Sequence, residues 1–136
     1  RRLGFEDALK AHGLWSDHIP ERACEFDSAS GYNRMKELID SGIRFDGVLC
    51  ATDNIAAGAL RALREAGIDV PGQIKLAGFG DTQLASLVTP PMTTVHYHYE
   101  ESGKEAAEMV MEQIRSGTRC VKSVMLGYEI VPRNTL

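Results

Sequence analysis

The sequence predicts an α/β fold in which a parallel sheet is flanked by helices. Short apolar runs alternate with helical segments, with strands separated by about 10–15 residues, which is typical of βαβ units. Two of the apolar runs end in polar turns, Thr52-Asp53 and Gly80-Asp81-Thr82. Because right-handed crossovers place the carboxyl ends of parallel strands at one edge of the sheet, we expect both turns at the same edge.

Composition excludes several classes of function. The 136 residues are enough for one domain, and 43% of them are hydrophobic, which suffices for a core. The net charge of -4 argues against nucleic-acid binding through a basic surface of this segment. No apolar run approaches the roughly 18 residues of a membrane span, and no signal peptide is expected. The widely spaced Cys24, Cys50 and Cys120 are expected to be reduced, buried thiols of a cytoplasmic protein.

Helical and strand periodicities divide the first third of the chain. Apolar residues at three- and four-residue spacing predict a first helix that ends at Gly13. The alternating run Arg22-Ala23-Cys24-Glu25-Phe26 predicts a strand with an aromatic residue at its end. Ser28 or Ser30 is expected to cap a second helix, which ends at Gly42.

A buried strand and its helix organise the middle of the chain. Residues 48–51 form a short apolar run of the kind found in parallel strands covered on both faces. Asp53 is expected to cap a helix that ends at Gly67 and buries Ile55, Ala56, Ala59, Leu60 and Leu63. Residues 74–79 predict the next buried strand, and 84–88 a short helical or irregular piece.

The pattern changes after residue 91. Residues 92–96 predict another strand, and a long amphipathic helix over about 99–116 follows, ended by Gly117. Residues 120–126 predict a strand, and 129–133 an extended tail.

The polar edge of the predicted sheet is the first candidate for a binding site, because open α/β sheets bind ligands beyond the carboxyl ends of their strands. Thr52, Asp53 and the turn at 80–82 lie at such ends, and Phe26 ends a third strand. An aromatic wall beside hydrogen-bonding groups suits a sugar, which presents both apolar faces and hydroxyls. Asp53 has an alternative role that needs no ligand, namely the cap of its helix.

No catalytic or metal-binding motif emerges from the sequence. Phosphate-binding glycine loops and the nucleophile elbow are absent. Asp53 and Asp81 could form an acid–base pair, but nothing separates their pKa values. His96 and His98 have the spacing of some metal ligands but lack a third partner nearby. We therefore predict a binding module without cofactor or metal, and not an enzyme.

Several short motifs follow one another along essentially the whole chain. They are Arg1-x-x-Gly4-Phe5-x-x-Ala8-Leu9, residues 45–53 with Ala56-x-Gly58-Ala59-Leu60, Val70-Pro71, Gly78-Phe79-Gly80-Asp81-Thr82, residues 89–95 and Val131-Pro132-Arg133-Asn134-Thr135. This ordered set resembles the effector-binding core of the LacI/GalR family of bacterial transcription regulators.

The resemblance implies a periplasmic-binding-protein-like (type I) core with two Rossmann-like lobes and the effector between them. Residues 1–96 would form the C-terminal lobe without its first strand, 97–126 a crossover helix and strand of the N-terminal lobe, and 127–136 a returning strand. The chain would then be an incomplete fragment, as its opening without methionine also suggests. Its long helix would expose Ala107, Val110 and Ile114.

The resemblance also assigns site residues. Effector contacts fall on Arg1, Phe26, Thr52, Asp53, Gly80, Asp81 and Tyr97. Gly80 stands where many members have a ligand-binding Asp, which leaves open whether Asp81 substitutes for it, and Thr52 stands where Asn is frequent. Candidates for a dimer interface, with an ordinary core role as the alternative, are Ala57, Leu84, Leu87 and Val88.

The implied function is effector-controlled transcription. A monosaccharide, disaccharide or sugar phosphate would reorient the lobes of a homodimer and change how N-terminal headpieces, absent here, meet operator DNA. One alternative is a periplasmic sugar-binding protein of a transport system. Another, a nucleotide-dependent transferase, needs a phosphate loop that is not visible. The unpaired cysteines and the Pro-x-x-Thr tail favour the regulator.

Overall fold

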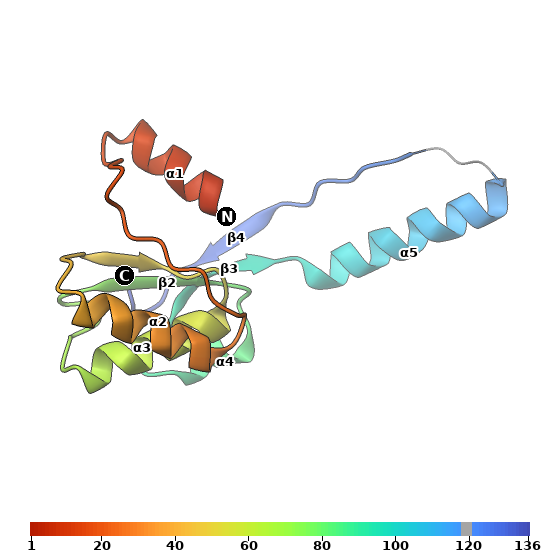
Figure 1. Cartoon of the computed structure of the whole chain (residues 1–136). Helices are drawn as coiled ribbons and strands as arrows, with labels where there is room; N and C mark the ends of the chain where they lie inside the picture. Colours follow the sequence, from red (N-terminus) through yellow and green to blue (C-terminus); the bar gives the residue numbers. More distant parts are fainter. Residues whose placement is uncertain (118–120) are drawn as a thin grey trace.

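A computed structural model describes residues 1–117 and 121–136 and contains one four-stranded sheet in the order β1-β2-β3-β4 (Figure 1). Strands β1, β2 and β3 are parallel, as predicted, and β4 is antiparallel to β3 because the chain leaves the sheet and returns to the same end. The elements are α1 (Arg2–Ala11), α2 (Ser28–Asp40), β1 (Gly47–Leu49), α3 (Asp53–Glu65), β2 (Lys75–Phe79), α4 (Gln83–Leu87), β3 (Thr93–Tyr97), α5 (Tyr99–Ser116) and β4 (Tyr128–Val131).

The core lies between the sheet and one layer of helices. Helices α2, α3 and α4 cover one face of the sheet, whereas α1 stands off the other face and buries none of its residues (Figure 1). All five apolar side chains predicted for the inner face of α3 are buried. Leu49 on β1 is 38% exposed, so the prediction of a strand covered on both faces is wrong for this chain.

Helices α2 and α3 pack unusually close to each other, and two glycines allow it. A methyl group at Gly31 would overlap the backbone of Ile55, and one at Gly58 would overlap the carbonyl oxygen of Ser28. Next to Gly31, the Tyr32 hydroxyl donates a 2.6 Å hydrogen bond to a carboxylate oxygen of Glu65, the last residue of α3. The first turns of α2 are therefore tied to α3 both by close backbone packing and by this hydrogen bond.

The C-terminal segment closes the core. Thr135 is fully buried; its carbonyl oxygen accepts from the Leu76 N–H at 2.8 Å, and its hydroxyl oxygen accepts from the Thr93 N–H at 2.8 Å. Arg133 donates from its backbone N–H to the Thr93 hydroxyl at 2.8 Å. These hydrogen bonds tie β2 and β3 to residues 40 or more positions away in the sequence.

Helix α5 and residues 121–127 project from the sheet as an arm (Figure 1). Helix α5 ends at Gly117, which takes the left-handed conformation at φ 62, as expected for a helix C-terminus. No residue of α5 is buried, and Ala107, Val110 and Ile114 are exposed, as predicted. None of the helices in the described residues is long and apolar enough to cross a membrane.

Two predicted strands are wrong. Residues 22–26 are irregular, because no neighbouring strand pairs with their backbone in the described structure. Residues 121–126 are also irregular, since they run along the arm away from the sheet; Cys120 lies outside the described residues. An alternating pattern favours a strand, but a strand also needs a partner for its N–H and C=O groups.

The two helix caps also differ from the predictions. The side chain of Asp27, not Ser28 or Ser30, caps α2 by accepting from the Ser30 N–H at 2.7 Å. At α3 the cap is Thr52, whose hydroxyl accepts from the Ile55 N–H at 3.3 Å. In both cases the capping residue directly precedes a residue that was predicted as the cap. The side chain of Asp53 instead accepts hydrogen bonds from Thr82 and Thr94.

Candidate functional site

Asp53 is a buried carboxylate that joins three elements at the carboxyl edge of the sheet. It is 1% exposed, and its Oδ1 accepts a 2.6 Å hydrogen bond from the Thr94 hydroxyl on β3. Its Oδ2 accepts from both the N–H and the hydroxyl of Thr82, at 2.7 and 3.1 Å. A methyl group at Gly78 would lie 2.5 Å from Oδ1, so the glycine makes room for the carboxylate. Asp53 thus fixes the turn after β2 relative to α3 and β3.

Asp81 is a second carboxylate with protein partners on both oxygens. Its Oδ1 accepts from Arg133 Nη2 at 2.6 Å, and its Oδ2 lies 3.1 Å from His96 Nδ1. Gly80, just before it, has φ 129, a conformation that favours glycine, and Asp81 itself has φ 48. The turn thereby aims Asp81 toward the C-terminal segment and the end of β3.

Arg1 lies over an aromatic pair at the same edge. Its guanidinium carbon is 5.3 Å from the ring centre of Phe79 and 5.7 Å from that of Tyr97, and these two rings stack with centres 6.5 Å apart. Arg1 Nη1 also donates to the Ala51 carbonyl oxygen at 2.6 Å. A guanidinium has several N–H donors, so this hydrogen bond does not exhaust it.

An apolar groove of about 740 Å³ opens beside these residues, between α1, the 22–26 segment and β1. Arg1, Phe26 and Phe79 line it, and Phe26 is 67% exposed. The remaining predicted effector contacts do not line the groove but surround the carboxyl edge next to it: Thr52, Asp53, Gly80, Asp81 and Tyr97. Sequence reasoning missed Phe79, although an aromatic residue at the last position of a strand that precedes a polar turn was a readable signal.

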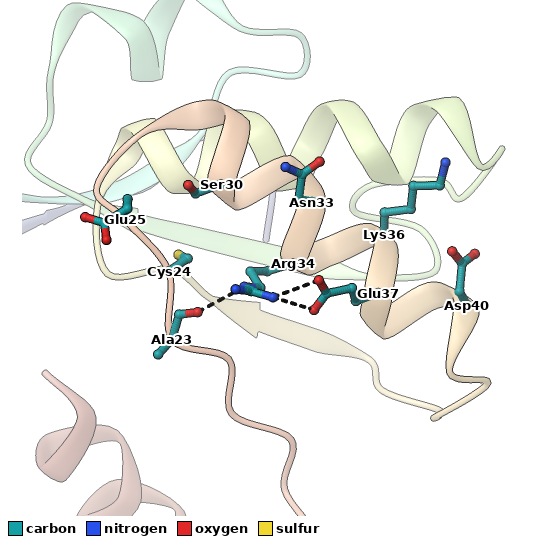
Figure 2. A pocket seen from close by; sticks show the side chains of 9 residues that line it. All are labelled: Ala23, Cys24, Glu25, Ser30, Asn33, Arg34, Lys36, Glu37 and Asp40. Carbon is teal, nitrogen blue, oxygen red and sulfur yellow. Dashed lines mark hydrogen bonds and ion pairs between the residues drawn. The ribbon is translucent and has the colours of Figure 1, made fainter.

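A second hollow, of about 640 Å³, lies along α2 and contains none of the predicted site residues (Figure 2). There Arg34 donates from Nη1 to both oxygens of Glu37 at 2.7 and 2.9 Å and from Nε to the Ala23 carbonyl at 3.1 Å. Burial raises the pKa of the Cys24 thiol in this hollow. Because this hollow contains none of the predicted site residues, it is not the candidate site.

Burial makes the two described thiols poor nucleophiles. Burial raises the pKa of Cys50 to about 12, and Cys24 is half-buried. Of these two, the prediction of a buried thiol is therefore confirmed for Cys50 and not for Cys24. Among residues 1–117 and 121–136, no group of three His, Cys, Asp or Glu side chains is arranged to hold a metal ion.

The residues predicted for a dimer interface lie on α3, on α4 and at the end of α4. Leu87 on α4 is 69% exposed, whereas Ala57, Leu84 and Val88 are half-buried, and Val88 packs against the core. Leu87 is therefore the member of this set with the most surface free for a partner.

The parallel strands end in a polar edge, and beside this edge lies a groove with an arginine over stacked aromatic rings. These features define a class of small-molecule-binding α/β lobes. Over residues 1–136 the chain matches the model of the periplasmic binding protein-like domain, and it belongs to that family, in the form found in LacI/GalR regulators.

Individual relatives support this assignment. The chain is 38% identical over 111 residues to the HTH-type transcriptional regulator GalR of Escherichia coli (strain K12), covering 82% of this chain and 32% of that protein. The structure of a transcriptional regulator CelR–cellobiose complex matches 97% of this chain and 40% of its own, with a TM-score of 0.91 and 31% identity. The lac repressor dimer bound to operator and the anti-inducer ONPF matches 99% of this chain and 46% of its own, with a TM-score of 0.90 and 27% identity.

The chain therefore spans about a third of the length of the first curated relatives. Those relatives are transcriptional regulators and a ribose operon repressor, and not enzymes, which agrees with the non-enzyme predicted from the sequence. They do not favour the transport-protein alternative.

Proposed function

We propose that this chain is the effector-binding and dimerisation part of a cytoplasmic transcriptional repressor that senses a small sugar. The observation that carries the proposal is Arg1, held over the rings of Phe79 and Tyr97 beside an open groove. Aromatic faces pack against the C–H faces of a sugar ring, and the guanidinium supplies donors for its hydroxyls or for a phosphate. The cellobiose complex of a relative and the ribose named in another support a sugar as the effector class.

Within this proposal the polar residues have two kinds of role. Arg1, Phe26, Thr52 and Tyr97 contact the effector, and Phe79 joins them. The others, Asp53, Gly80 and Asp81, act mainly by shaping the edge on which the effector rests. Both carboxylates are occupied by protein donors, which supports a positioning role.

We also propose that the chain is part of a two-lobed core. Residues 1–96 form most of the C-terminal lobe, 97–126 cross to the N-terminal lobe, and 127–136 return. Two features support this division: the exposed apolar side chains of the arm, and the outer edge of β1, which pairs with no strand among the described residues and faces the apolar groove. An upstream first strand of the lobe fits that edge.

The mechanism that follows is allosteric. Effector in the cleft holds the lobes in one relative orientation, and a homodimer that pairs partly through Ala57, Leu84, Leu87 and Val88 transmits the change to N-terminal headpieces on operator DNA. The operator complex of the lac repressor dimer supports this arrangement. The acidic balance of this segment agrees with DNA contacts made elsewhere.

The test is a thermal-shift screen of the full-length protein against ribose, galactose, cellobiose, trehalose, their phosphates and purine nucleotides. A sugar that binds only the folded state raises the midpoint of unfolding by mass action. Arg1→Gln is expected to weaken binding of that sugar by roughly tenfold or more, the scale of a hydrogen bond to a charged group.

The exposed Arg64→Gln is the matched control, because Arg64 lies at the far end of α3. An unchanged affinity of Arg1→Gln for that sugar would show that Arg1 does not contact the effector. Stabilisation by nucleotides alone would overturn the sugar assignment and reopen an enzyme reading.

A further inference from the structure

Two histidines lie where the chain leaves the sheet for the arm, and each faces a carboxylate. His96 Nδ1 is 3.1 Å from Asp81 Oδ2, and these two side chains are 36% and 19% exposed. His98 Nε2 is 4.0 Å from Glu129 Oε1 on β4. The imidazole rings touch edge to face, with centres 5.6 Å apart.

Few other titratable or charged groups face this pair in the described structure. Arg133, from the C-terminal segment, pairs with the other oxygen of Asp81 at 2.6 Å, and the Tyr99 ring of α5 lies 6.4 Å from the His96 ring. The next acidic residue of α5, Glu100, pairs with Lys104 at 2.8 Å. When both histidines are neutral, the charged groups of the junction are therefore the two carboxylates of Asp81 and Glu129 and the single guanidinium of Arg133.

The junction is connected to the candidate site by hydrogen bonds. The Asp81 N–H donates to the Thr94 hydroxyl oxygen at 3.3 Å, and that hydroxyl donates to Asp53 at 2.6 Å. Asp53 Oδ2 also accepts a hydrogen bond from the Thr82 N–H at 2.7 Å. The turn at residues 80–82 therefore lies between the effector edge on one side and His96 on the other.

We propose that this junction is a pH-sensitive hinge, in which protonation of His96 and His98 locks the turn at residues 80–82 to the base of the arm. Histidine is the side chain that changes charge between about pH 5 and 8. A protonated His96 forms a charge-assisted hydrogen bond with Asp81, which is stronger than the neutral one. A protonated His98 gains attraction to Glu129.

The direction of the effect follows from the charges. Two imidazolium groups repel each other, but each faces its own carboxylate, and Arg133 pairs with the other oxygen of Asp81. Lower pH therefore tightens the hinge, and the added contact is lost as pH rises and the imidazoles become neutral. The inference goes beyond the proposed function, and its test requires no effector.

The test measures backbone hydrogen exchange of Gly80, Asp81 and Thr82 in the full-length protein at pH 6 and pH 8, corrected for intrinsic exchange. We expect about threefold to fivefold stronger protection at pH 6, the scale of a partly exposed ion pair. His96→Gln keeps a neutral donor and should lower the pH 6 protection most of the way to the pH 8 value, leaving the smaller part that the His98–Glu129 pair contributes. His96→Arg carries a fixed charge and should keep the high value at both.

The exposed His12→Gln, at the end of α1, is the control and should behave like the wild type. A purely structural role of His96 would lower protection equally at both pH values in both His96 variants, which would overturn the proposal. Equal protection of the wild type at pH 6 and pH 8, or the same pH ratio in His96→Gln, would also overturn it.

Discussion

At the scale of single residues, the carboxylate of Asp53 shows how one side chain serves fold and site together. It accepts a hydrogen bond from the Thr94 hydroxyl on β3 and two from Thr82, and it is almost completely buried. Removing an acceptor from buried donors costs more than a hydrogen bond contributes, because the donors are left without water. The predicted role as a mere helix cap gives way to a role in tertiary structure.

We predict that Asp53→Ala lowers the free energy of unfolding by about 3 kcal/mol, since it leaves the Thr94 hydroxyl and the Thr82 N–H without their acceptor. Urea unfolding followed by circular dichroism measures the loss. The neighbouring exposed Asn54→Ala should change it by less than about 0.5 kcal/mol. A loss below about 1 kcal/mol in Asp53→Ala would show that other acceptors or water replace the carboxylate.

At the scale of elements, the close pair α2–α3 depends on residues that contribute no side chain. We predict that Gly58→Ala destabilises the core by about 2 kcal/mol or more, because the methyl group would overlap the Ser28 carbonyl and push the helices apart. Gly4→Ala on α1 is the control, since nothing lies within 4 Å of that position. An unchanged thermal midpoint in Gly58→Ala would mean that α2 can shift without loss of packing.

At the scale of the whole molecule, the arm exposes more apolar surface than the isolated chain can cover. We predict that residues 1–136 on their own bind a hydrophobic dye and self-associate, because Val110, Ile114 and Met125 are not covered by any of the residues that the structure describes. Size-exclusion chromatography with light scattering measures the association. Replacing residues 99–127 by a short Gly/Ser linker should reduce both effects. A well-folded monomer of the intact 136 residues that binds no dye would contradict this prediction.

Much of the fold was predictable from the sequence because it depends on local patterns. The spacing of apolar residues located α1, α3 and α5, the left-handed glycines at 13, 67 and 117 marked helix ends, and apolar runs located β1, β2 and β3. The two failed strands, at 22–26 and 121–126, have the right local pattern but no partner for their backbone.

The candidate site was predictable in position but less so in detail. The polar turns after the predicted strands indicated that the site lies at the carboxyl edge of the sheet. The ordered motifs indicated the family, which the match to the family model confirms. The partners of Asp53 and Asp81 were not predictable, since Thr94 and Arg133 lie 41 and 52 residues away along the chain. Phe79 was also missed, because its importance comes from Tyr97 and Arg1 beside it.

The sequence by itself determined which segments form helices, which strands end in polar turns, and to which family the chain belongs, because periodicity, turn residues and motif order are properties of neighbouring residues. Only the tertiary structure decided that β4 runs antiparallel, that both carboxylates are engaged within the protein, and that the histidines meet carboxylates at the base of the arm. Those features are contacts between distant residues, and their geometry exists only once the sheet has formed.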